Sequence, residues 1–284
     1  GREGESDAAW AAIEASAAGI DRSPFLMSRS RSMPGFGMEI LESGADQADP
    51  RSKTALVLRT GVGQGHGHCD QIGLIFYARG CHALTDNGRR GGNPNSRASK
   101  VHNLVEVDEK DFMPVAQGRT GVGWAEALKD WGEGGYVSAS ASSSSHPYLK
   151  TYRREAVLVP AGESGAYVAD VFRVSGGNVH TWCCAGPVCG ETSMLQVNVP
   201  MRPGQDGLLK TYLAENFEYR ALGEAVDPLV FTWRVDPDAV KRQIGGKTQP
   251  EVLVRAWHLG AAGRPVMHAW TKLSDYTGQG TPHN

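Results

Sequence analysis

Short apolar runs recur along most of the chain, and each is bounded by glycine, aspartate, asparagine or proline. Many of them contain β-branched or aromatic residues, which favour strands. The runs that predict strands lie at residues 35–44, 54–61, 72–80, 103–108, 151–160, 166–176, 178–186, 193–200, 229–236, 251–260 and 266–273. Because almost no helical pattern separates these runs, the chain is predicted to be all-β, folded as a large antiparallel β-sandwich.

Helical patterns are confined mainly to the N-terminus and the 120s. Residues 7–19 are rich in alanine and end in glycine, which predicts a short N-terminal helix. A linker that contains Pro24 and Pro34 follows this helix. We therefore divide the chain into an N-terminal helix and linker, residues 1–32, and a β-sandwich domain, residues 33–284.

Two irregular stretches interrupt the strand pattern. The serine-rich residues 137–147 resemble a flexible linker, but inside a β domain we interpret them as a loop that leads into a strand. Residues 87–100 form a basic, glycine-rich loop without an acidic residue. The basic side chains of this loop are Arg89, Arg90, Arg97 and Lys100.

The composition narrows the possible partners. The 284 residues carry a formal net charge of -2, so the sequence implies no basic surface for nucleic acid. No run of about 18 apolar residues occurs, so no membrane span is expected. Five cysteines occur, and three of them, Cys183, Cys184 and Cys189, are close enough for a zinc knuckle or a local disulfide. Because they lie on or just after an apolar run, we expect them to pack as small hydrophobic residues.

The stretch "GHGHCDQIGLIF", residues 65–76, carries candidate chemistry. His66, His68 and Asp70 occupy every second position, so on a strand they would share one face, roughly 6 to 7 Å apart. Imidazole nitrogens and carboxylates are the usual ligands of zinc and similar ions. Glycines at 61, 63, 65 and 67 leave room beside the histidines for a ligand or another chain segment.

Spacing alone does not select the third ligand. Asp70, Asp86 and His102 are all candidates. A cupin-type metal enzyme is an alternative, since it also places a His-x-His pair on a strand. That pattern has a glutamate a few residues after the second histidine, and this chain has none there.

The ordered pattern resembles the heparinase II/III-like polysaccharide lyases. Residues 65–88, "GHGHCDQIGLIFYARGCHALTDNG", look like the H-x-H-x-D run, apolar strand, Tyr-Ala-Gly-type turn and Asp-x-Gly of that family. Residues 96–108, "SRASKVHNLVEVD", resemble its His-Asn pair before a strand. The resemblance covers residues 33 to about 182 well, and the remainder only by its strand pattern.

This resemblance implies a role for each matching residue. His68, Asp86 and His102 would bind a structural divalent metal, most often zinc, that ties three strands together. His66 would point at the substrate and assist catalysis. Asp70 would orient a histidine by a hydrogen bond.

The resemblance also implies the reaction: β-elimination at uronic-acid residues of an acidic polysaccharide, by a secreted or periplasmic enzyme. Independently of the resemblance, arginine suits two-point binding of carboxylate or sulfate, so Arg89 and Arg90 are expected to bind the glycan, and an ordinary solvated basic loop is the alternative. Family members carry an N-terminal α/α-toroid, so we expect this chain to be the β-sandwich half, with a toroid domain or partner chain elsewhere. A glycan-binding β-sandwich without catalysis is the second alternative.

Overall fold

The structure is a computed structural model that describes most of the predicted β domain. The described residues are 12, 15–16, 30–44, 51–61, 68–86, 98–112, 121–143, 145–162, 165–187, 194–202, 217–235 and 251–271. Of the predicted N-terminal helix, Ala12, Ala15 and Ser16 are helical, and the rest lies outside these residues. The domain boundary at residue 33 stays a prediction.

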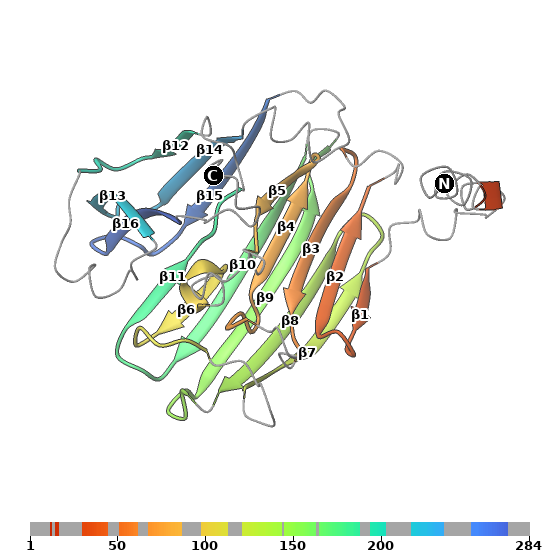
Figure 1. The fold of residues 1–284 in the computed structure, drawn as a ribbon, viewed down its shortest axis with the longest axis horizontal. Helices are drawn as coiled ribbons and strands as arrows, with labels where there is room; N and C mark the ends of the chain where they lie inside the picture. The colour runs from red at the N-terminus through yellow and green to blue at the C-terminus, as the bar shows by residue number, and fades with distance from the viewer. Residues whose placement is uncertain are drawn as a thin grey trace, which may run out of the picture.

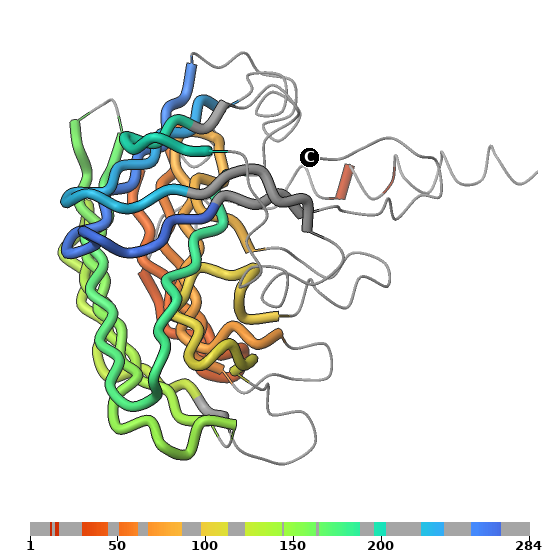
Figure 2. Tube along the Cα trace, turned by 90° about the vertical axis from the view of Figure 1, so that its left-hand side faces the viewer, coloured from red at the N-terminus to blue at the C-terminus, as the bar shows by residue number. Residues whose placement is uncertain are grey.

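Two antiparallel sheets lie face to face, one in front of the other (Figure 1). The first has five strands in the order of the chain: β1 (Arg31–Met33), β2 (Met38–Ser43), β3 (Thr54–Arg59), β4 (Leu74–Ala78) and β5 (Cys81–Leu84). The second has four strands in the reverse order: β10 (Ala166–Ser175), β9 (Thr151–Pro160), β8 (Gly135–Ser143) and β7 (Gly121–Asp130). Seen from the side, they form two layers (Figure 2). The predicted antiparallel β-sandwich is thus confirmed.

One hydrophobic core lies between the two sheets. Alternation along β3 turns Leu56 and Leu58 inward, and the same alternation along β9 turns Ala156 and Leu158 inward to meet them. All four side chains are fully buried. Burying a leucine contributes roughly 1.5–3 kcal/mol, so the two periodic strands supply much of the free energy that holds the layers together.

Smaller antiparallel sheets continue the fold. The strand β6 (Leu104–Val107) pairs with β11 (His180–Cys183), and a 3-10 turn, η2 (Ser99–Val101), precedes β6. Towards the C-terminus, one sheet has the order β12 (Met194–Val197), β14 (Leu229–Val235) and β15 (Val252–His258). A last pair joins β13 (Phe217–Glu224) to β16 (Pro265–Thr271). In the described part of the chain, no helix is long and apolar enough to cross a membrane.

Every run that the sequence pattern assigned to a strand contains one, but the prediction of a helix in the 120s is wrong. Residues 121–130 form β7, which pairs with β8 along its whole length and has a bulge between Ala125 and Ala127. The alanines favour a helix weakly, by a few tenths of a kcal/mol per residue. Pairing with β8 and packing on the core outweigh that preference.

The prediction of a loop in the serine-rich stretch is also wrong, because most of the stretch belongs to the strand β8. Its small apolar residues Val137, Ala139 and Ala141 are buried at every second position, whereas Ser140 and Ser142 are more exposed. The alternation of buried and exposed residues that is typical of a strand is therefore present in the sequence, but the many serines make it hard to recognise. As predicted, Cys183 is buried, and Cys189 lies outside the described residues.

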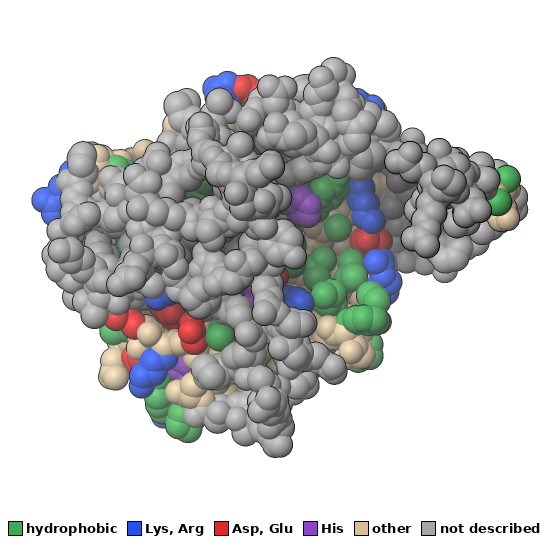
Figure 3. Space-filling view, in the orientation of Figure 1, with side chains coloured by type: hydrophobic (Ala, Val, Ile, Leu, Met, Phe, Trp, Pro, Cys, Tyr) green, Lys and Arg blue, Asp and Glu red, His purple; other side chains and the backbone are tan. Residues whose placement is uncertain are grey.

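The outward face of the five-stranded sheet combines apolar and charged side chains (Figure 3). Glu42 lies on the opposite face from the core residue Leu41, because neighbouring residues of a strand alternate. Its carboxylate pairs with Arg31 at 2.8 Å and with Lys53 at 2.9 Å. Burial would raise the pKa of Glu42, but these two cations outweigh burial and lower it. This face is therefore mixed in charge.

Candidate metal centre

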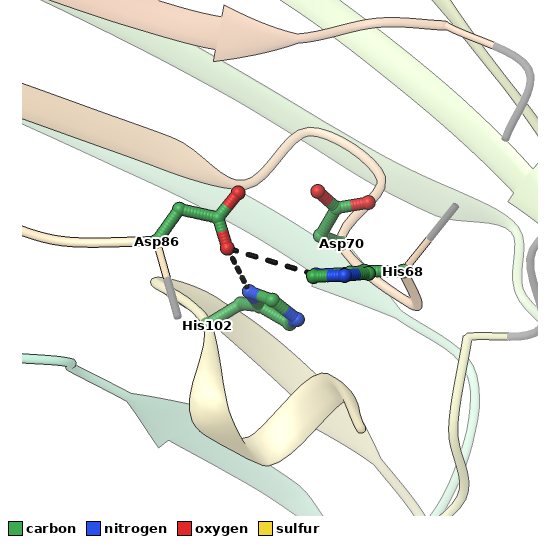
Figure 4. A group of neighbouring side chains, drawn as sticks. All are labelled: His68, Asp70, Asp86 and His102. Carbon is green, nitrogen blue, oxygen red and sulfur yellow. Dashed lines mark ion pairs between the residues drawn. The ribbon is translucent and has the colours of Figure 1, made fainter. Parts of the chain in front are cut away.

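Four potential metal ligands converge at one end of the five-stranded sheet (Figure 4). His68 and Asp70 lie in the connection between β3 and β4, and Asp86 comes two residues after β5. His102 directly follows the 3-10 turn η2, where it caps the turn by donating its backbone N–H to the Ser99 carbonyl. Three segments that are separate in the sequence thus meet at this point.

The prediction that His68 and Asp70 lie on a strand is wrong. Both precede β4 in an irregular segment, where the N–H of Gly73 donates to the Asp70 carbonyl at 2.8 Å. Ile72, in the same turn, has a φ of 49°. The chain turns here because it must pass from β3 into β4, and functional side chains are commonly carried on such connections.

Close backbone contact fixes the start of this segment. Gly37, in the turn between β1 and β2, has a φ of 62°, and a Cβ added there would lie 1.8 Å from the Cα of Gly61. The carbonyl of Gly37 accepts from the N–H groups of Thr60 and Gly61 at 2.8 and 3.0 Å. As predicted, the glycine at position 61 makes room for another chain segment.

The ligand atoms are grouped tightly enough for one ion. One atom from each of the four side chains lies within 4.8 Å of all the others. Asp86 Oδ1 is 2.7 Å from His102 Nδ1 and 3.9 Å from His68 Nδ1. The rings of His68 and His102 lie 5.2 Å apart between centroids, tilted by 38°. The carboxylate of Asp86 therefore stands between the two imidazoles.

Asp86 and His102 form an ion pair at 2.7 Å, but its geometry is not that of an aligned hydrogen bond. Asp86 Oδ1 and both ring nitrogens of His102 are buried, and none has a hydrogen-bond partner among the described residues. A buried polar atom without a partner costs about 1–3 kcal/mol. Two ligands bound tetrahedrally to one zinc ion at roughly 2.0–2.2 Å lie about 3.3–3.6 Å apart, a value between the 2.7 and 3.9 Å that separate Asp86 Oδ1 from His102 Nδ1 and His68 Nδ1. An ion bound here would take the Asp86 oxygen and one ring nitrogen of His102 as ligands.

The two carboxylates of the cluster differ in acidity. Burial would raise the pKa of Asp86, but the imidazoles of His102 and His68 outweigh it and lower the pKa well below its usual range. Burial raises the pKa of Asp70, and Arg59, whose Nε lies 3.4 Å from Asp70 Oδ2, opposes this only partly. Asp86 is consequently the more readily ionised of the two carboxyl groups.

The donor set fits a divalent cation of the zinc class. Two imidazoles and one carboxylate from His68, His102 and Asp86 are ligands that zinc accepts readily. Asp70 is close enough to be a fourth ligand, or to lie beside the other three without binding the ion. Its ionised carboxylate with that of Asp86 would balance the charge of a divalent ion. The proposed hydrogen bond from Asp70 to a histidine stays a prediction.

Two polar side chains to which the sequence analysis gave no role of their own, Ser99 and Asn103, anchor these segments. Ser99 Oγ donates to the Cys69 carbonyl at 2.8 Å, between His68 and Asp70 in the chain. Asn103 Nδ2 donates to the Thr85 carbonyl at 2.7 Å, one residue before Asp86. In the sequence, Asn103 stood out only by its position directly after His102. Both anchors are buried.

Three of the predicted site residues are not placed. His66, Arg89 and Arg90 lie outside the described residues, so their predicted roles at the substrate stay predictions.

Comparisons with known proteins find only remote similarity. No protein-family model matches the chain. No curated protein matches it either. Among solved structures, a mutant of the heparan sulfate lyase HepC from Pedobacter heparinus is similar with a TM-score of 0.38 and 11% identity, over 85% of this chain. A heparinase III gene product with methylated lysines has a TM-score of 0.38 and 11% identity over 86%, and a heparinase III has 0.37 and 11% over 85%. This chain spans 36% of the length of each of those chains.

Proposed function

We propose that this chain is the metal-containing β-sandwich part of a polysaccharide lyase that acts on uronic-acid residues of an acidic glycan. One observation carries the proposal. The three residues that the sequence resemblance assigns to a metal, His68, Asp86 and His102, come from three separate segments and converge. Buried ligand atoms of Asp86 and His102 have no hydrogen-bond partner among the described residues. Residues in a chance sequence match would have no reason to meet in this way.

In this proposal, a divalent ion such as zinc is held by His68, Asp86 and His102, and it ties their three connecting segments together. Its role would be structural: it would bind the converging nitrogen and oxygen atoms of these side chains and add to the hydrogen bonds that already join the segments. Such a tie would hold the described parts of the three segments in place.

The reaction determines what the remaining residues must do. A base takes the C5 proton of the uronate, a C4=C5 double bond forms, the C4–O bond breaks, and the leaving oxygen receives a proton. Because negative charge develops next to the uronate carboxylate, a cation must bind that carboxylate. We assign this cation to Arg89 or Arg90, and a proton-transfer or charge-stabilising role to His66. A helical domain or partner chain would supply the other wall of the cleft.

Formation of the double bond tests the proposed activity. The natural protein that contains this chain is incubated with a panel of uronic-acid polysaccharides, and the near-ultraviolet absorbance of the unsaturated product is followed. Absorbance that rises with at least one glycan supports the lyase. Binding to an immobilised glycan without any rise would favour the glycan-binding alternative. A cobalt-substituted protein whose spectrum changes when a small ligand is added has an open metal position, as a cupin-type enzyme requires.

A further inference from the structure

A buried arginine on the far sheet reaches the metal centre. Arg154 belongs to β9 and is 2% exposed. It lies on the inward face of the strand, in line with the core residues Tyr152, Ala156 and Leu158. A guanidinium that is removed from water is strongly destabilising unless its donors are satisfied. Its partners therefore indicate why the fold keeps it there.

One side of the guanidinium is held by a carboxylate. Arg154 Nε and Nη2 donate to the two oxygens of Asp170 on the neighbouring strand β10, at 2.8 and 2.7 Å. This two-point pairing fixes the plane of the guanidinium, which a lysine ammonium cannot reproduce. The guanidinium also lies 5.0 Å from the ring centroid of Phe172. The fork is thus held in one orientation before it reaches the other sheet.

The remaining nitrogen of Arg154 binds the segments that carry the ligands. Nη1 donates to the carbonyl of Ile72 at 2.9 Å and to the carbonyl of Asn103 at 2.5 Å. Ile72 comes two residues after Asp70, and Asn103 follows His102 directly. One nitrogen therefore joins the segment of His68 and Asp70 to the segment of His102.

The third segment is connected through the same asparagine. The side chain of Asn103 donates to the Thr85 carbonyl at 2.7 Å and accepts from the N–H of Ala185 at 2.8 Å. Thr85 directly precedes Asp86. A continuous set of hydrogen bonds thus runs from Asp170 through Arg154 and Asn103 to all three ligand-bearing segments.

We propose that Arg154 is a positioning residue of the metal centre: it sets the spacing of the three segments so that their ligand atoms converge before an ion binds. The inference rests on the proposed metal site. It adds that the affinity of that site is set partly from the opposite sheet, by a side chain that touches no ligand atom itself. Hydrogen bonds of this kind around a metal site typically change affinity by about 10–100-fold.

The experiment measures the zinc dissociation constant of the full chain by competition with a chromophoric chelator. Arg154→Met is expected to weaken zinc binding about 10–100-fold. Arg154→Lys, which keeps a donor but loses the fork, is expected to fall between Arg154→Met and the parent. Arg153→Met is the matched control, because Arg153 is the next residue of β9 but pairs with Glu126 and Glu155 away from the core. Its zinc affinity should equal that of the parent.

Stability is measured on the same proteins, with and without zinc. A role confined to packing would lower the melting temperature of the metal-free protein and leave the zinc dissociation constant within about twofold of the parent, which would overturn the inference. Should Arg154→Met not fold, Asp170→Asn loosens the fork without emptying the core and should weaken zinc binding in the same direction. If the parent chain binds no zinc, the metal site itself is refuted. If Arg154→Met binds zinc as tightly as the parent, only the role of Arg154 is refuted.

Discussion

Two clusters of charged side chains on this molecule satisfy their polar atoms in opposite ways. On the outward face of the four-stranded sheet, Glu126 accepts from Ser140 and Arg153, and Glu155 accepts from Tyr136 and pairs with Arg153. This network is partly exposed, and its charged atoms are paired with other protein side chains.

At the candidate metal centre, by contrast, buried atoms of Asp86 and His102 form an ion pair at 2.7 Å but have no hydrogen-bond partner among the described residues. An exposed cluster can also use water, so its pairs are worth little. A buried cluster has no such alternative, and its unbonded atoms are costly. The contrast teaches that the convergence of several buried ligand atoms without hydrogen-bond partners, rather than charge alone, favours a ligand site.

The largest expected effect is the loss of the metal. His68→Ala or His102→Ala removes one of the three ligands, so bound zinc is expected to fall from about one equivalent to nearly none. Elemental analysis of the purified variants measures this. His180→Ala is the matched control, because His180 is exposed and its Nε2 contacts the Gly176 carbonyl. Unchanged metal content in both His68→Ala and His102→Ala would contradict the assignment.

The next effect separates the two histidines of the His-x-His pair. His66→Ala in the natural protein is expected to slow formation of unsaturated product by about 10²-fold or more, the usual scale for a positioned acid, base or charge-stabilising group. Bound metal and melting temperature should stay near the parent values. Loss of metal together with activity would place His66 among the ligands and favour the cupin-type alternative. Full activity would remove His66 from the reaction.

Much of the fold could be read from the sequence, because alternation in strands such as β9 survives in the pattern of apolar residues. The strand β7 could not, since its alanines favour a helix and only pairing with β8 overrides them.

The convergence of His68, Asp86 and His102 could be predicted from an ordered motif, but the residues that support them could not. Alternation does place Arg154 on the apolar face of β9, which signals an unusual buried charge. Its partners Ile72 and Asn103 are 82 and 51 residues away along the chain. No local pattern encodes contacts of that separation, and only the packing of the two sheets creates them.

Removal of the metal should have a moderate effect on stability. If zinc is present at about a hundred times its dissociation constant, it stabilises the folded chain by about 2.7 kcal/mol, which corresponds to a melting temperature about 5 °C higher. A chelator is therefore expected to lower the melting temperature of the parent by about this amount. His68→Ala, which has no metal to lose, should not respond. An equal response of both proteins would mean that the chelator acts elsewhere.

The smallest effect is expected at the partly exposed cluster of Glu126, Arg153 and Glu155 on the four-stranded sheet. Glu126→Gln keeps the size of the side chain but removes the charge that pairs with Arg153. Because the side chains of Glu126 and Arg153 are 29% and 30% exposed, water can replace much of the lost interaction. The free energy of unfolding should change by less than about 1 kcal/mol, and the zinc dissociation constant should not change. Chemical denaturation in low and high salt measures this, and the small difference should shrink further in high salt. A loss as large as that caused by chelation would show that exposure does not separate the two clusters, and the contrast between them would have to rest on the missing hydrogen bonds alone.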